Sequence, residues 1–80
     1  MIRILLSTRL GERRMPQAEL ARRTGIRPAA INDMYNELTE RVNLVYLDLI
    51  CKELDIKLGD LLVREDDILP DTVPLTKPNR

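Results

Sequence analysis

The stretch that decides the fold is residues 16–36, which read PQAELARRTGIRPAAINDMYN. Pro16 and Pro28 each suit the first turn of a helix, where the missing N–H of proline would have no partner in any case. Gly25 stands between them as the left-handed residue that ends a helix. The sequence therefore predicts a short helix that stops at Gly25, followed after a brief gap by another helix from Pro28. A tight glycine turn between two short helices is typical of a helix-turn-helix.

Apolar residues at helical spacing continue on both sides of this stretch. Within the second of its helices, Ile31 and Met34 share one face, and Leu38 follows four residues later. Upstream, a helix over residues 2–14 is predicted by the stripe Ile2, Leu6 and Leu10. Downstream, Asn43 is a good N-cap for a fourth helix, whose apolar stripe consists of Leu47, Ile50, Cys51 and Leu54.

Residues 57–63 predict a short fifth helix, and the character of the chain changes after them. Residues 64–67 are charged, and Pro70, Pro74 and Pro78 then exclude a further helix. We therefore expect an all-α fold, a compact five-helix bundle. Residues 1–63 would form the helix-turn-helix domain, and residues 64–80 would form an extended, Pro-rich tail.

Composition narrows the possible functions. The chain has 80 residues, of which 44% are hydrophobic and only 2% aromatic, so the core must be aliphatic. There is one cysteine, which excludes an internal disulfide and suggests a cytoplasmic protein. The absence of histidine weighs against an enzyme and against a metal site. We expect no cofactor, no small-molecule substrate and no membrane association.

The net charge is zero, but the charges are unevenly distributed. Residues 1–41 carry eight basic and five acidic side chains, whereas residues 42–80 carry five basic and eight acidic ones. A domain with this asymmetry can present a basic face to phosphate groups.

The motif resembles the helix-turn-helix of the Cro and lambda-repressor type, known as the XRE family. The pattern is Gln17-x-x-Leu-Ala-x-x-x-Gly-Ile, followed by apolar Ile31 and Met34. Within it, Ala21 takes the position where only a small side chain lets the two helices cross. The likeness continues through the last two helices and covers roughly residues 3–63. The chain departs from the family at Pro16 and Arg27, where Ser or Thr is usual, and at Asn36-Glu37, where Asn-Gly is common.

The resemblance implies a function and a set of DNA contacts. Family members bind DNA with the second motif helix in the major groove, so we expect a sequence-specific transcriptional regulator, and specifically a repressor. Gln17 would hold the phosphate backbone, unless it is simply a solvated residue at a helix start. Arg27 would pair with guanine or clamp a phosphate. Asn32 would pair with adenine or remain a polar surface residue.

Six further residues complete the predicted DNA-binding set, namely Arg22, Pro28, Ala29, Asp33, Tyr35 and Asn36. Ala29 keeps the start of the helix small and can touch a thymine methyl group. Asp33 must turn outward, pair with an arginine or accept a hydrogen bond from cytosine. Tyr35 and Asn36 could reach the DNA backbone, and Tyr35 could equally cover the edge of the core. Arg22 could flank phosphates or belong to a solvated helical face.

Two questions about partners stay open at this level. The first is whether the chain binds double-stranded DNA. In the alternative interpretation, the chain uses the same fold to bind another protein, as an interaction module or an antitoxin-like partner. The second is how a homodimer would form, which we expect because one helix-turn-helix reads few base pairs. One candidate surface is Leu44, Val45 and Leu49 of the fourth helix. The other is the apolar set of the tail, Ile68, Leu69, Val73 and Leu75.

Overall fold

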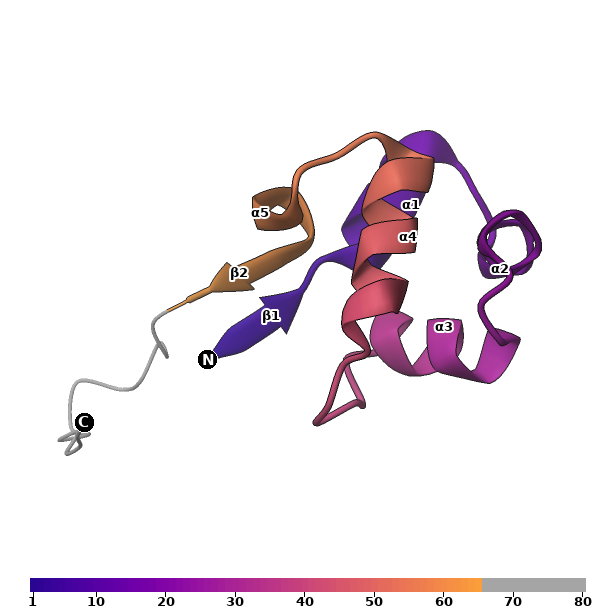
Figure 1. The fold of residues 1–80 in the computed structure, drawn as a ribbon. Coiled ribbons are helices and arrows are strands. Elements are labelled where there is room, and N and C mark those ends of the chain that lie inside the picture. The colour runs from indigo at the N-terminus through magenta and orange to yellow at the C-terminus, as the bar shows by residue number, and fades with distance from the viewer. Residues whose placement is uncertain (66–80) are drawn as a thin grey trace, which may run out of the picture.

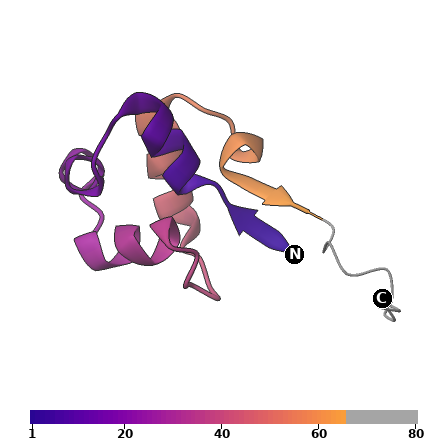
Figure 2. The same ribbon diagram turned by 180° about the vertical axis from the view of Figure 1, so that it is seen from behind.

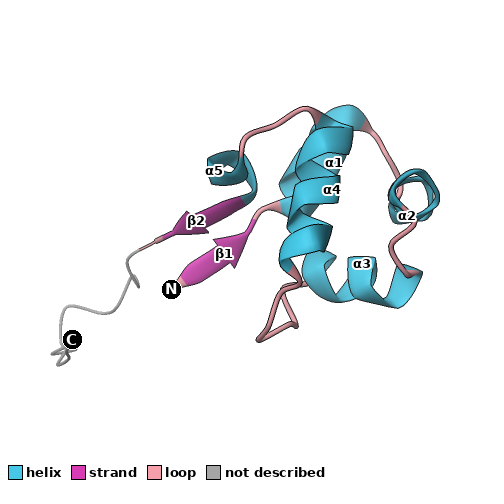
Figure 3. Ribbon diagram, in the orientation of Figure 1, coloured by secondary structure: helices cyan, strands magenta, loops and turns pink. Residues whose placement is uncertain are grey.

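The computed structural model of the chain describes residues 1–65 (Figure 1). Residues 66–80, which hold the apolar residues of the predicted tail, lie outside the described part. Within residues 1–65 the element order is β1 (Ile2–Ile4), α1 (Leu6–Arg13), α2 (Gln17–Thr24), α3 (Pro28–Tyr35), α4 (Leu44–Leu54), α5 (Leu58–Leu61) and β2 (Leu62–Arg64). The helices form the body of the molecule, and the two strands lie side by side at one end (Figure 3).

The helix-turn-helix forms where Gly25 and Pro28 predict it, whereas Pro16 is the N-cap residue before α2 and not part of its first turn. Gly25 is left-handed, with a φ of 79°, and its N–H donates to the carbonyl oxygen of Ala21 at 2.9 Å. Pro28 lies in the first turn of α3. The Asn43 side chain accepts hydrogen bonds from two N–H groups of the first turn of α4. These local rules fix the start or the end of three helices, and the corresponding predictions are confirmed.

The core is aliphatic and is shared by the five helices of residues 1–65. It consists of Ile4, Leu6, Leu10, Leu20, Ala21, Ile26, Ile31, Met34, Leu47, Ile50, Leu54 and Leu61. Helix α2 packs against α3 and α4, and α1 packs against α3. Seen from either side, α3 lies across the end of the view where α4 begins (Figures 1 and 2). This packing turns one face of α3 inward and leaves its opposite face toward solvent.

The expectation of an all-α fold needs correction at both ends of the domain. The first helix begins at Leu6 and not at Ile2, because residues 2–4 form β1 and pair antiparallel with β2. The register places Arg3 opposite Val63. Only Leu6 and Leu10 of the predicted stripe are buried, whereas Ile2 is 61% exposed. The fifth helix is shorter than predicted, since its last residues belong to β2. Pairing across the sequence has overridden local helical spacing here.

Two predictions about individual apolar residues also need correction. Leu38 does not continue the buried face of α3 and is 68% exposed, because the helix ends at Tyr35 and the chain reverses at Glu37. Leu49 is not spare surface on α4, because it is half-buried and packs against the core. None of the helices formed by residues 1–65 has the length and apolar character that crossing a lipid bilayer requires.

Candidate nucleic-acid interface

Three residues of α3 and its C-cap residue form a solvent-facing surface, which we call the outward stripe: Ala29, Asn32, Asp33 and Asn36. All four are exposed, while Ile31 and Met34 on the opposite side are buried. The stripe follows from helical spacing, because residues three and four apart share a face. It brings together four of the predicted DNA-binding residues on one surface, and Pro28 is exposed at the same end of the helix as Ala29.

Two amides on the outward stripe are hydrogen-bonded to each other. The Nδ2 group of Asn36 donates to the side-chain oxygen Oδ1 of Asn32 at 3.1 Å and to the Asn32 carbonyl oxygen at 3.0 Å. Because an amide oxygen has two lone pairs, Oδ1 of Asn32 can still accept one more hydrogen bond. The Nδ2 group of Asn32 can still donate. Asn32 therefore keeps the donor–acceptor pair that matches the N6 and N7 edge of adenine.

The starts of α2 and α3, the two helices of the motif, have no side-chain caps. Pro16 precedes α2 and Arg27 precedes α3, and neither supplies a capping hydrogen bond. In α2 the N–H groups of Gln17 and Ala18 are left without a partner among residues 1–65. In α3 only the Ala29 N–H is left, because Pro28 has none and the Ala30 N–H donates to the Arg27 carbonyl oxygen. These N–H groups, at the positive ends of the helix dipoles, suit a phosphate oxygen. The two departures from the family pattern lie at these caps, where Ser or Thr would occupy the N–H groups.

The arginines near the turn differ in how far they are already engaged. Arg27 is exposed, and no ion pair or side-chain hydrogen bond joins it to another residue within 1–65. The Arg22 side chain is 72% exposed and only approaches Glu19, at 3.8 Å. Arg23, in contrast, bonds to Glu19 and to Glu53 of α4, and these carboxylates raise its pKa. Arg22 and Arg27 are thus available to phosphate or bases, while Arg23 ties α2 to α4.

Two of the predicted contacts are less exposed than the outward stripe. Gln17 is half-buried and is the first residue of α2. Tyr35 is half-buried and packs against the core, which agrees with its alternative role at the core edge. Asp33 is exposed and has no ion-pair partner among residues 1–65.

Sequence reasoning passed over Arg41, which the fold brings close to α3. Arg41 and Asp33 line one shallow hollow of about 130 Å³ between α3, the following loop and the start of α4. The loop is shaped by Thr39, whose hydroxyl donates to the Arg41 carbonyl oxygen and accepts from the Arg41 N–H. The sequence signal was a threonine two residues before an arginine, a spacing that permits such a local turn.

Glu37 was treated only as a departure from the family, yet it is the most connected residue at the end of α3. Its carboxylate accepts from Nε and Nη2 of Arg3 at 2.7 and 2.9 Å and from the Ile4 N–H at 3.1 Å. The hydrogen bonds from Arg3, and then that from Ile4, lower the pKa of Glu37 below its ordinary value. Glu37 itself is left-handed, with a φ of 56°, so it takes the conformation for which the family often uses glycine.

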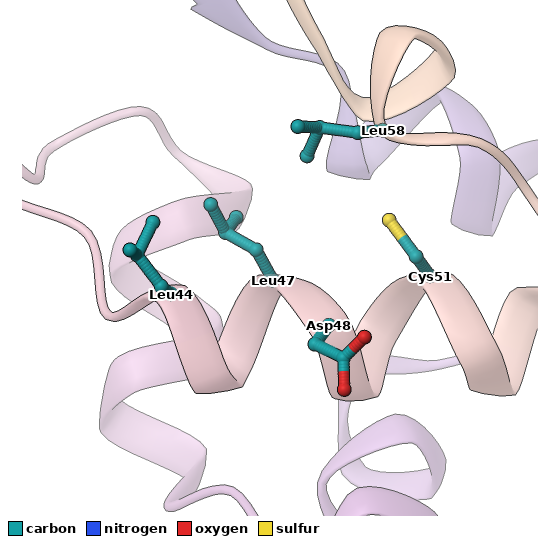
Figure 4. A pocket seen from close by; sticks show the side chains of 5 residues that line it. All are labelled: Leu44, Leu47, Asp48, Cys51 and Leu58. Carbon is teal, nitrogen blue, oxygen red and sulfur yellow. The ribbon is translucent and has the colours of Figure 1, made fainter.

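An apolar groove lies on another face, between α4 and α5. It has a volume of about 300 Å³ and is lined by Leu44, Leu47, Asp48, Cys51 and Leu58 (Figure 4). Leu44 and Leu58 are 75% and 54% exposed at its rim. Cys51 is half-buried and packs against the core, and burial raises the pKa of its thiol. Cys51 is thus part of the wall of this groove.

Comparison with known proteins agrees with this geometry. The sequence matches the family described as Cro/C1-type HTH DNA-binding domain over residues 6–67. Searches of curated protein sequences and of solved structures returned no match. The matched range contains α1 through β2, and therefore the whole helix-turn-helix with its outward stripe. The chain belongs to the family of Cro/C1-type helix-turn-helix DNA-binding domains.

Proposed function

We propose that this protein is a sequence-specific transcriptional regulator that inserts α3 into the major groove of double-stranded DNA. The observation that carries the proposal is the outward stripe of α3, a set of exposed small and polar side chains beside two uncapped helix starts. An α-helix fits the major groove of B-DNA, where each base pair presents a distinct set of donors and acceptors. The start of α3 is narrow at Pro28 and Ala29, which suits close approach to the base edges.

Four residues are candidates for reading bases in this proposal. Asn32 pairs with adenine, Arg27 pairs with guanine or clamps a phosphate, and Ala29 touches a thymine methyl group. Asp33 either accepts from cytosine or turns toward Arg41, which lines the same hollow.

Backbone contacts come from residues around the two helix starts and the loop. Gln17 and Arg22 approach phosphates from α2, Asn36 from the end of α3, and Arg41 from the loop that follows. Tyr35 has a smaller share, because it is half-buried against the core. These contacts set the register of the protein on DNA without reading sequence.

Repression follows most simply from occupancy, because a protein bound over a promoter excludes the polymerase without any further activity. The site of action in this proposal is the cytoplasm, where the regulated DNA would lie. A homodimer is part of the same proposal, since one motif contacts too few base pairs for tight specificity.

The groove between α4 and α5 is the surface that we assign to the dimer. Its rim is apolar at the exposed residues Leu44 and Leu58, and Val45, which follows Leu44 on α4 outside the groove lining, is 62% exposed. Asp48 and Lys52 form an ion pair one turn apart at 3.2 Å, and both side chains are well exposed. If two copies of α4 pack antiparallel about a two-fold axis, each Asp48 can meet the Lys52 of the other copy. The surface is thus complementary in charge to itself.

The proposal is tested by titrating the protein with short duplexes and following its amide resonances by NMR. We expect shifts at the outward stripe and at both uncapped helix starts, with little change in the α4–α5 groove. A plot of the logarithm of the binding constant against the logarithm of the salt concentration should have a slope of about −0.9 for each phosphate contacted. Shifts confined to the groove, or none at low salt, would instead favour the reading of the chain as a protein-interaction module.

A further inference from the structure

We infer that Glu37 is a positioning residue for DNA recognition, which locks the end of α3 to the ribbon formed by β1 and β2. The inference rests on the proposed function, because its main effect is read through DNA binding. It concerns a residue that touches no DNA in the proposal and that acts through Asn36 and Asn32.

The backbone at the end of α3 forms a standard left-handed stop. The Leu38 N–H donates to the Asp33 carbonyl oxygen at 2.9 Å, and the Glu37 N–H donates to that of Met34 at 3.2 Å. This pair of bonds is a Schellman motif with Glu37 as its left-handed residue. The turn directs the Glu37 side chain away from α3 and toward β1.

The side chain then makes contacts that the turn alone does not require. One carboxylate accepts two parallel bonds from the Arg3 guanidinium and a third from the Ile4 N–H. Arg3 in turn bonds to Glu65, directly after β2, at 3.3 Å. The Glu37 side chain therefore joins the end of α3 to β1, and Arg3 extends the connection to the residue that follows β2. Paired bonds between arginine and carboxylate fix orientation as well as distance.

Two other helix ends show that the turn is stable without such contacts. Arg14 after α1 and Asp55 after α4 have φ values of 52° and 55° and make the same pair of backbone bonds. Within residues 1–65, no ion pair or hydrogen bond joins the side chain of either residue to another residue. The lock at Glu37 is thus an addition to the stop signal, placed only after the helix that carries the outward stripe.

Glu37 is connected to Asn32, the residue that would read adenine, through Asn36. Asn36 directly precedes Glu37, so its backbone is held wherever Glu37 is held. The Asn36 side chain donates to Oδ1 of Asn32 at 3.1 Å and so orients the amide that would face adenine. Loosening Glu37 should therefore disturb the reading of one base pair and the contact made by Asn36, while leaving the phosphate contacts of Gln17 and Arg22 on α2 in place.

The test compares Glu37→Gln with two matched variants of the full chain. Glu37→Gln keeps the length of the side chain and removes its charge. Glu40→Gln removes the same charge from the same loop, where the Glu40 side chain bonds to no other residue within 1–65, and so controls for reduced repulsion of DNA. Glu37→Gly and its control Asp55→Gly both place glycine at a left-handed position and so remove the same steric strain of the backbone. Only Glu37→Gly also removes the contacts with Arg3 and Ile4. Circular dichroism melts establish that each variant is folded at the temperature of the assay.

Each variant is measured by fluorescence anisotropy on the duplex that the wild type selects and on an unrelated duplex. We expect Glu37→Gln and Glu37→Gly to lower the ratio of specific to non-specific affinity by about two- to fivefold, the scale of a half-exposed charge pair. Glu40→Gln and Asp55→Gly should leave that ratio unchanged. Wild-type binding by Glu37→Gln, or an equal loss in Glu40→Gln, would overturn the inference.

NMR of the free protein tests the lock without DNA. In Glu37→Gln we expect the side-chain amide resonances of Asn36 and Asn32 to shift, with no such shift in Glu40→Gln. Unchanged amide resonances would contradict the coupling. A wild type that selects no duplex would refute the proposed function, and the NMR comparison would still decide whether Glu37 holds the end of α3.

Discussion

Replacing Gly25 by alanine should destabilise the domain through the backbone alone. Gly25 has a φ of 79°, and a Cβ atom added there would meet nothing within 4 Å. The left-handed conformation costs an L-residue about 1–2 kcal/mol, while the reduced entropy of the unfolded alanine chain returns about 0.4–1 kcal/mol. We therefore expect a net loss of about 0–1.6 kcal/mol in the free energy of unfolding, centred on about 0.8 kcal/mol.

Gly11 provides the matched control, because alanine should have the opposite effect there. It lies inside α1, and an added Cβ would again meet nothing within 4 Å. Alanine in a helix interior is favoured over glycine by about 0.5–1 kcal/mol. The two variants carry the same change in the same chain and differ in backbone conformation, so packing does not confuse the comparison.

Thermal melts of Gly25→Ala and Gly11→Ala followed by circular dichroism measure both effects. A change of 1 kcal/mol moves the Tm of a domain of this size by about 4–8 °C, so the two midpoints should separate clearly and on opposite sides of the wild type. Equal midpoints, or a stabilised Gly25→Ala, would refute the assignment of Gly25 as the left-handed stop between α2 and α3.

Three further predictions follow from the contacts described above. Asn43→Ala removes the only side-chain acceptor at the start of α4 among the described residues, and chemical denaturation should show a loss of about 0.5–2 kcal/mol. Ile31→Ala empties a fully buried position between α3 and the core and should cost about 2–5 kcal/mol, so that in thermal melts the transition moves sharply down or disappears. The pKa of Glu37 is lowered by Arg3 and the Ile4 N–H, so its stabilisation is complete above the unfolded-state pKa of about 4.3 and is lost as the pH falls through the lower folded-state value. Stability measured against pH should thus show the wild type converging on Glu37→Gln in acid, and a constant difference between them would contradict the ion pair.

The elements that the sequence predicted best are those set by local chemistry. Gly25, Pro28 and Asn43 each act within a few residues of chain, through backbone conformation or a capping bond. The apolar stripe of α4 was predictable for the same reason, because helical spacing alone turns Leu47 and Ile50 inward.

The elements that the sequence did not predict depend on partners far away in the chain. Ile2 continues the helical stripe of Leu6 and Leu10, yet it lies in a strand because residues 62–64 are available to pair with it. Nothing in the local pattern distinguishes these outcomes, since short apolar runs suit both helix and strand. The exposure of Leu38 was unpredictable for a similar reason. It follows from the reversal of the chain after α3, which depends on Glu37 taking a left-handed conformation.

The candidate site was predictable in part. Asn32 and Ala29 could be placed on the outward face from the buried positions of Ile31 and Met34. The engagement of Arg23 by Glu53 and that of Glu37 by Arg3 could not, because each joins elements about thirty residues apart in sequence. Which charges remain available to DNA is therefore a property of the tertiary structure.

Selection from a randomised duplex library, run in parallel with the wild type and Asn32→Ala, tests most directly whether α3 reads bases. We predict that the wild type enriches a short site at low salt, in the form of an inverted repeat if the protein binds as a dimer. Asn32→Ala should enrich a related site that has lost its preference at one base pair of each half. Failure of the wild type to enrich any site, or an identical site from both proteins, would contradict the assignment of α3 as the recognition helix.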